Sequence, residues 1–133
     1  MNTKINYFYR DADNYKSAKS IILDGKISKE CLKRFRSILD EGEYFIPSDV
    51  GLENLQSELQ KFDVKDNIDS DGFYNPFGPE GADHVWHTLD SIELTNEKPT
   101  TELSNDEFCS LINEDNFIGW DVEGTEKKLI SQI

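Results

Sequence analysis

The amino-acid sequence predicts an α+β fold: a small antiparallel β-sheet with about four helices packed on it, forming a single domain over residues 1–133. Segments with alternating apolar residues are interspersed with segments whose apolar residues recur at helical spacing. A chain of 133 residues is long enough for one hydrophobic core. Eight Phe, five Tyr and two Trp supply large side chains for that core, although only 36% of the residues are hydrophobic.

The N-terminal segment predicts two antiparallel strands. Residues 5–10 are rich in aromatic side chains that alternate between two faces. The turn-forming residues 11–14 separate them from a second strand at 19–23. Because the connection is short, we expect the two strands to pair as neighbours.

The next segment predicts a helix, a short strand and a second helix. Ser28 is a good N-cap for a helix over 29–41, and Gly42 supplies its C-terminal stop. Residues 43–47 read as a short extended strand that a proline ends. Leucines at helical spacing predict a further helix near 52–61.

The second half begins with a turn-rich loop at about 63–83, which is long for a small domain and is therefore a candidate functional segment. The apolar run 84–94 predicts a strand with an irregularity, since its large apolar residues do not alternate strictly. A capping box at 104–107 opens a helix. Asp121 or Thr125 caps the last one. The helix after the capping box is expected to bury Phe108, Leu111 and Ile112.

The two cysteines, Cys31 and Cys109, lie far apart in helix-like stretches beside apolar residues. We expect two reduced thiols in the core, with a disulfide as the alternative. No apolar run is long enough to cross a bilayer, and the N-terminus lacks the apolar segment of a signal peptide. These features predict a cytoplasmic protein without a membrane partner.

The charge is negative and unevenly distributed. The chain carries a net charge of −13, of which residues 1–36 contribute +5 and residues 37–133 contribute −18. Between Asp66 and Glu126 there are sixteen acids and one base. Such a surface repels phosphate backbones, which disfavours direct nucleic-acid binding, and attracts cationic proteins or metal ions. A role in solubility alone is the alternative.

A partial calcium-loop pattern lies in the acidic half. Asn67, Asp69 and Asp71 followed by Gly72 match the start of such a loop, in which alternate oxygens face one ion. Gly78 stands where the bidentate glutamate is required. An Asx-rich turn without an ion is therefore the preferred interpretation; we expect no cofactor, with calcium as the alternative.

Both histidines lie in one apolar stretch around Trp86. His84 and His87, with Asp83 and Asp90 nearby, suggest either a metal site or the site of a small hydrolase-like enzyme. No nucleophile elbow, catalytic-triad spacing or phosphate-binding loop accompanies them, so an enzyme is not favoured. A structural role for one histidine and an exposed position for the other is the preferred interpretation.

The aromatic side chains of the long loop suggest a binding surface. Phe73, Tyr74 and Phe77 lie in the loop beside Asp69 and Asp71. Aromatic anchors among acids suit a protein interface, whereas packing back onto the core is the alternative. Our leading hypothesis is an acidic interaction protein, of the inhibitor or immunity type, that binds a basic protein such as a toxin or nuclease.

Four segments together resemble a family of small, acidic, uncharacterised bacterial proteins. They are residues 7–16, 39–47, 50–52 and 83–87, so the resemblance covers most of the first 95 residues. It implies a bacterial cytoplasmic domain. The family carries no known activity, so the resemblance assigns no functional residue.

Overall fold

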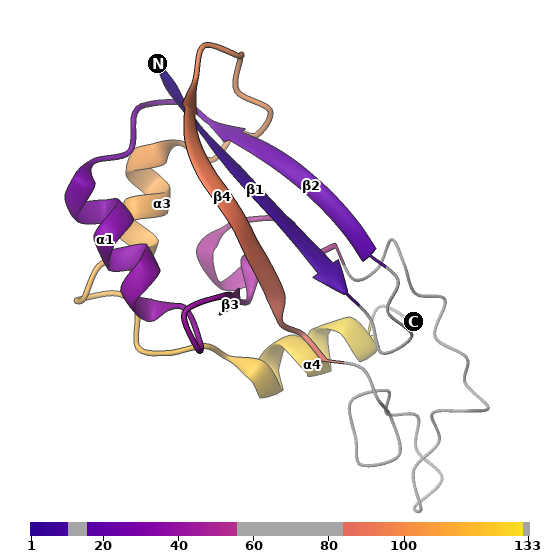
Figure 1. Cartoon of the computed structure of the whole chain (residues 1–133). Helices are drawn as coiled ribbons and strands as arrows, with labels where there is room; N and C mark the ends of the chain where they lie inside the picture. Colours follow the sequence, from indigo (N-terminus) through magenta and orange to yellow (C-terminus); the bar gives the residue numbers. More distant parts are fainter. Residues whose placement is uncertain (11–15, 56–83, 132–133) are drawn as a thin grey trace, which may run out of the picture.

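The computed structural model describes residues 1–10, 16–55 and 84–131 of the chain (Figure 1). Its elements are β1 (Asn2–Arg10), β2 (Lys16–Leu23), α1 (Lys29–Ile38), β3 (Tyr44–Phe45), the 3₁₀-helix η1 (Pro47–Val50), β4 (His87–Thr95), α3 (Asn105–Ile112) and α4 (Val122–Ser131). The strands form one antiparallel sheet in the order β2-β1-β4-β3. The predicted α+β class is confirmed, but this part of the chain contains three α-helices rather than about four.

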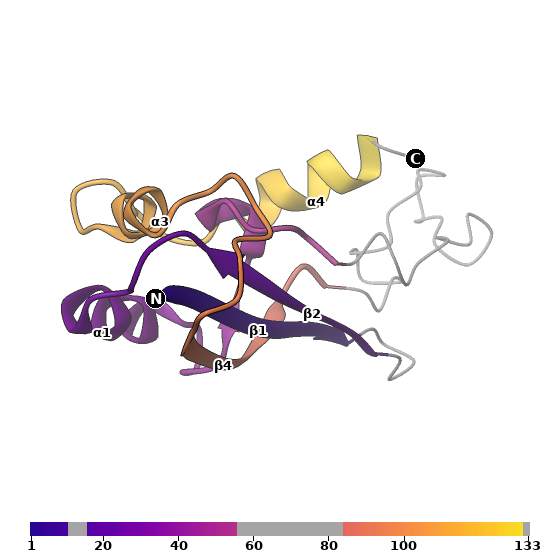
Figure 2. The same cartoon turned by 90° about the horizontal axis from the view of Figure 1, so that it is seen from above.

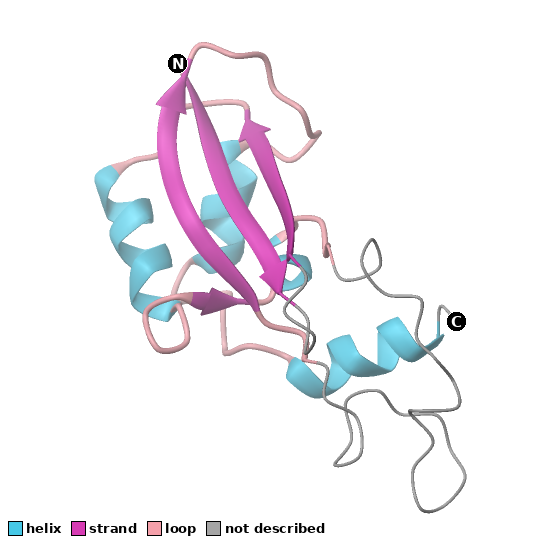
Figure 3. Cartoon of the chain, turned by 45° about the vertical axis from the view of Figure 1, so that its right-hand side comes forward, coloured by secondary structure: helices cyan, strands magenta, loops and turns pink. Residues whose placement is uncertain are grey.

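The helices gather on one face of the sheet. α1 and α3 lie side by side behind the long strands, and α4 runs near the end of the sheet where β4 begins (Figures 1 and 3). Seen from above, β1, β2 and β4 form a layer whose other face carries no helix of the described residues (Figure 2). We call this other face the open face. None of the described helices is long and apolar enough to cross a membrane.

The central strand β1 shows the alternation that its sequence predicts. Its odd-numbered residues are buried against the helices, and its even-numbered residues lie on the open face, half-buried except for the exposed Arg10. The buried set is Thr3, Ile5, Tyr7 and Tyr9. The register between β1 and β4 shifts at Asn6 and Tyr7, which leaves Asp90 as the extra residue. This bulge confirms the predicted irregularity in the last strand.

The first helix begins where the sequence predicts but ends earlier. The hydroxyl of Ser28 accepts a hydrogen bond from the backbone N–H of Cys31, which confirms the N-cap. The helix stops at Ile38, because the following residues form a tight turn. Glu41 and Gly42 both have positive φ there, 51° and 78°, as in the type I′ turns that join antiparallel segments.

The second predicted helix is wrong for the residues that can be compared. Residues 52–55 are not helical; the rest of the predicted range, like the predicted loop 63–83, lies outside the described residues. Leu52 and Leu55 are nevertheless buried. At Leu52 and Leu55 the leucine spacing therefore marked core positions in a non-helical segment rather than one face of a helix.

The two helices of the second half each begin after a capping residue that the sequence predicts. Ser104 and Glu107 form the predicted capping box of α3, and the carboxylate of Asp121, not Thr125, caps α4 by accepting from the N–H of Gly124. Phe108 and Ile112 are buried as expected. Leu111 is not, since its side chain is 39% exposed at the flank of α3. The buried stripe of this short helix is thus narrower than predicted.

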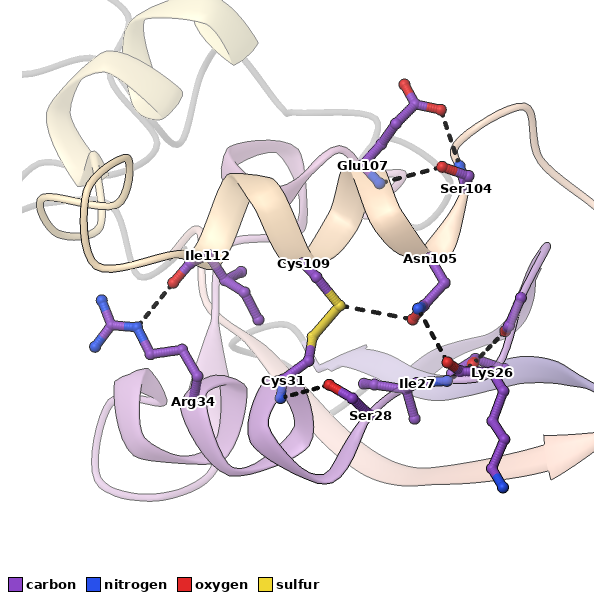
Figure 4. The surroundings of a disulfide bond; sticks show 12 residues. Lys26, Ile27, Ser28, Cys31, Arg34, Ser104, Asn105, Glu107, Cys109 and Ile112 are labelled. Atoms are coloured by element: carbon purple, nitrogen blue, oxygen red, sulfur yellow. Dashed lines mark hydrogen bonds between the residues drawn. A yellow bond between two sulfur atoms is a disulfide. The ribbon is translucent and has the colours of Figure 1, made fainter.

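The expectation of two reduced thiols is wrong. Cys31 in α1 and Cys109 in α3 form a disulfide, with their Cα atoms 5.8 Å apart (Figure 4). The bridge spans 78 residues of sequence and joins two helices that meet only in the tertiary fold. The helices also share an edge-to-face contact between Phe35 and Phe108, whose ring centroids lie 5.2 Å apart.

Replacement of both cysteines by alanine should lower the free energy of unfolding by about 4 kcal/mol, because the bridge closes a long loop in the unfolded chain. Urea unfolding followed by circular dichroism measures the difference. A reductant should destabilise the natural chain and leave the double variant unchanged. Equal stability of the oxidised chain and the variant would contradict a stabilising bridge.

Candidate functional site

The sequence-predicted site residues divide into two groups. The candidates of the long loop lie outside the described residues, namely Asn67, Asp69, Asp71, Phe73, Tyr74 and Phe77. Calcium binding and partner binding by that loop therefore stay predictions. His84 and Trp86 lie in the segment that leads into β4, and His87 is the first residue of that strand. In the part of the chain that the structure describes, no three His, Cys, Asp or Glu side chains come together to hold a metal.

His87 is a structural residue. Its side chain is completely buried, and both ring nitrogens are used. Nε2 accepts a 2.9 Å hydrogen bond from the backbone N–H of Leu55, so the ring proton is on Nδ1, which donates to the carbonyl of Val85 at 3.1 Å. Burial lowers the pKa of His87 to about 4. The imidazole is thus neutral at pH 7 and has no free nitrogen for catalysis.

His84 is half-buried and is held in a similar way. Its Nδ1 accepts from the backbone N–H of Trp86 at 3.1 Å, which places the proton on Nε2, and Nε2 donates to the carbonyl of Arg10 at 2.9 Å. The hydroxyl of Tyr9 donates to the carbonyl of His84 at 2.9 Å. An acid–base role would require His84 to break one of these backbone contacts. The ring therefore serves first to position the segment that carries Trp86.

Trp86 forms part of a surface groove that we call the aromatic groove. The groove has a volume of about 320 Å³ and is lined by Asp40, Glu41, Tyr44, His84 and Trp86. A neighbouring hollow of about 290 Å³ shares Tyr44, His84 and Trp86, and extends over Phe8, Arg10, Glu43 and Thr88. The aromatic groove therefore continues onto the open face of the sheet, and sequences far apart in the chain build it together.

The acidic wall of the aromatic groove is a structured turn. The backbone N–H of Asp40 donates to the carbonyl of Tyr44 at 2.8 Å, and the N–H of Tyr44 donates to the carbonyl of Asp40 at 2.9 Å. Asp40, Glu41 and Glu43 are all exposed. The hydrogen-bonded backbone of this turn therefore places three carboxylate-bearing residues next to Tyr44 in the fold.

The aromatic wall is supported from behind. The rings of Trp86 and Trp120 pack edge to face with centroids 6.4 Å apart. The indole N–H of Trp120 donates to the carbonyl of Ile38 at 2.8 Å. Trp120 thereby connects Trp86 to the end of α1, directly before the acidic turn. The half-exposed face of Trp86 is consequently presented in a fixed position.

The arrangement suits recognition of a cation. Carboxylates attract an ammonium or guanidinium group by charge, and the rings of Tyr44 and Trp86, which line the same groove, can add a cation–π interaction. The cation of the neighbouring hollow, Arg10, is already placed with its guanidinium carbon 5.8 Å from the ring centroid of Phe8. Sequence reasoning found Trp86 and His84 but missed Asp40, Glu41 and Tyr44. An acidic Asp-Glu-Gly-Glu turn directly before an aromatic residue was the available signal.

The burial of His87 predicts a pH-dependent stability. The unfolded side chain takes up a proton near pH 6.5 and the folded one near pH 4, so the unfolded chain holds more protons between these values. The contribution of neutral His87 is complete above pH 6.5 and is lost as the pH falls towards 4, by about 3 kcal/mol in total. Urea unfolding of the natural chain and a His87→Gln variant across this range measures it.

The two proteins share the same carboxylates, whose effects on stability cancel in the comparison. The difference in unfolding free energy should therefore shrink as the pH falls, because only the natural chain loses the contribution of His87. A difference that stays constant from pH 7 to pH 4 would show that His87 does not titrate as its burial requires.

Comparison with models of known protein families, with curated proteins and with solved structures found no match to this chain.

Proposed function

We propose that the protein binds a basic protein and that the aromatic groove receives a lysine or arginine side chain of that partner. Its role would be that of an inhibitor or immunity-type protein acting on a cationic target such as a toxin or nuclease, in the bacterial cytoplasm. The observation that carries the proposal is the acidic turn held beside Tyr44 and Trp86 in one groove.

Charge complementarity supports a cationic occupant. Asp40 and Glu41 line the aromatic groove itself, and Glu43 lines the hollow that continues it. All three carboxylates are exposed, so little desolvation is needed before a cation reaches them. An anionic ligand would meet three negative charges at the same place. The local field therefore selects for a positive group.

The aromatic walls support an organic cation rather than a metal ion. Tyr44 and Trp86 are half-buried, so part of each ring is accessible. A cation over an aromatic face gains about 0.5–2 kcal/mol, and arginine also stacks its planar group on the ring. Aromatic residues are common anchors at the centre of protein interfaces. A hydrated metal ion would use neither wall.

The charge of the whole chain supports a protein partner. A net charge of −13 attracts a basic protein over distances comparable to the Debye length and raises the rate of association. Long-range attraction would bring the partner to the surface, and the aromatic groove would fix one of its cationic side chains. Binding of this kind weakens steeply as salt is added.

A fluorescent hexa-arginine peptide provides a defined cationic probe. The chain should bind it at low salt, and an Asp40→Asn/Glu41→Gln variant should bind it roughly tenfold more weakly because two carboxylates beside the groove are lost. Trp86→Ala should weaken binding to a similar degree. Fluorescence anisotropy at two salt concentrations gives the dissociation constants.

The matched control is Glu114→Gln/Asp115→Asn, which removes the same charge from an exposed connection after α3. This variant should lose less than about threefold in affinity, since only the long-range field changes. Equal losses in the two double variants would show that net charge alone drives binding and would contradict a role for the groove. Absence of binding at low salt would contradict the whole proposal.

A further inference from the structure

We propose that the Cys31–Cys109 disulfide is a thiol-exchange site, attacked at the sulfur of Cys109 with Cys31 as the leaving thiolate. The site is separate from the aromatic groove and rests on different observations. Both cysteines line a surface pocket of about 280 Å³ between α1 and α3, together with Glu30, Arg34 and Glu114. A thiol in solution can therefore approach the bridge without unfolding of the core.

The two sulfurs differ in their surroundings. Cys109 is half-buried, whereas Cys31 is only 8% exposed and lies in the first turn of α1, where its N–H bonds the Ser28 cap. An incoming thiolate therefore reaches Cys109 more easily. A negative charge on Cys31 would lie at the positive end of a ten-residue helix, which favours its departure as a thiolate.

Asn105 provides a partner for the reduced form. Its side-chain oxygen lies 3.7 Å from the sulfur of Cys109 (Figure 4). A disulfide sulfur has no proton to donate, so this contact becomes a hydrogen bond only after reduction. The amide of Asn105 also donates to the carbonyl of Lys26 at 3.2 Å, which turns its oxygen towards the sulfur. The oxidised protein therefore already holds a hydrogen-bond acceptor beside the sulfur that becomes a thiol on reduction.

The helices stay together without the bridge. The guanidinium Nε of Arg34 donates to the carbonyl of Ile112 at 2.8 Å, and Phe35 packs against Phe108 beneath the disulfide. Reduction would therefore loosen α1 and α3 while leaving the core in place. This behaviour suits a bridge that opens and closes reversibly.

The exchange balances as a two-electron transfer from a dithiol. A thiolate of the dithiol bonds to the sulfur of Cys109, the S–S bond breaks, and Cys31 leaves as a thiolate that takes up a proton. The second thiol of the reductant then attacks its own sulfur in the mixed disulfide and releases Cys109, which is protonated and donates to Asn105. The protein gains two hydrogen atoms, and the reductant becomes a cyclic disulfide.

The first test treats the folded, full-length chain with dithiothreitol without denaturant and follows its intact mass. The expected result is a gain of two hydrogen atoms, with an amide NMR spectrum that keeps its folded dispersion. Reduction that requires a denaturant, or that abolishes the dispersion, would overturn the proposal, because the bridge would then be a sealed structural element.

The second test identifies the attacked sulfur. Limiting glutathione is added, free thiols are blocked with N-ethylmaleimide, and the peptides are mapped by mass spectrometry. The proposal requires glutathione on Cys109 and N-ethylmaleimide on Cys31. The opposite pattern would overturn the assignment of the attacked sulfur and the leaving group.

The third test checks that the thiol arrives through the pocket. Cationic cysteamine and anionic mercaptoethanesulfonate are compared as reductants of the natural chain and of Glu114→Gln. The ratio of the two rates should change by roughly two- to fivefold in this variant, because a carboxylate beside the pocket is lost. Glu102→Gln, which removes an exposed charge outside the pocket, is the control. An equal change in both variants would overturn entry through the pocket.

Discussion

Buried polar groups beneath the sheet need hydrogen-bond partners, and meeting that need determines where the chain runs on both sides of residues 56–83. Two tyrosine hydroxyls and one imidazole are involved, and an unpaired group in such a place costs about 1–3 kcal/mol. The bonds join Tyr7 with Glu53, Tyr9 with His84, and His87 with Leu55. The backbone that leads up to this segment and the backbone that follows it are therefore both attached to the buried face of the sheet.

The aromatic groove is the outer side of the same arrangement. Val85 and His87 are buried in the core, whereas their neighbours His84 and Trp86 are only half-buried and reach the surface. Phe45 is likewise buried, so its neighbour Tyr44 faces outwards. The core residues thus specify which side chains line the groove. His87 does not line the groove, but it lies buried directly next to Trp86 in the chain. The substitution His87→Gln is therefore expected to move the walls of the groove.

Local signals in the sequence predicted the helices and strands better than they predicted the contacts between these elements. The caps of α1 and α3 and the alternation of β1 each depend on residues a few positions apart, and all three are confirmed. The disulfide was only the alternative prediction, because it depends on two helices docking across 78 residues. Leu52 and Leu55 misled the helix prediction, since buried residues of a non-helical segment can share helical spacing by chance.

The sequence predicted only those residues of the aromatic groove that a local signal marks. Trp86 and His84 stand out by residue type in the sequence, whereas Asp40 and Glu41 are two acids among 27 in the whole chain. The pairing of β3 with β4, Tyr44 opposite Thr88, brings the acidic turn to Trp86. That pairing is a long-range contact that no local pattern encodes.

The disulfide and the aromatic groove lie at the two ends of α1, which raises the question of whether they are coupled. The bridge holds the first turn of the helix, and the acidic turn follows its last residue, Ile38. The turn is fixed by its own backbone bonds between Asp40 and Tyr44, and the carbonyl of Ile38 is held by Trp120. Coupling between two sites requires that one changes the free energy of the other's states. Because the groove keeps these contacts when the bridge opens, we expect a bound cation to stabilise the oxidised and reduced forms about equally.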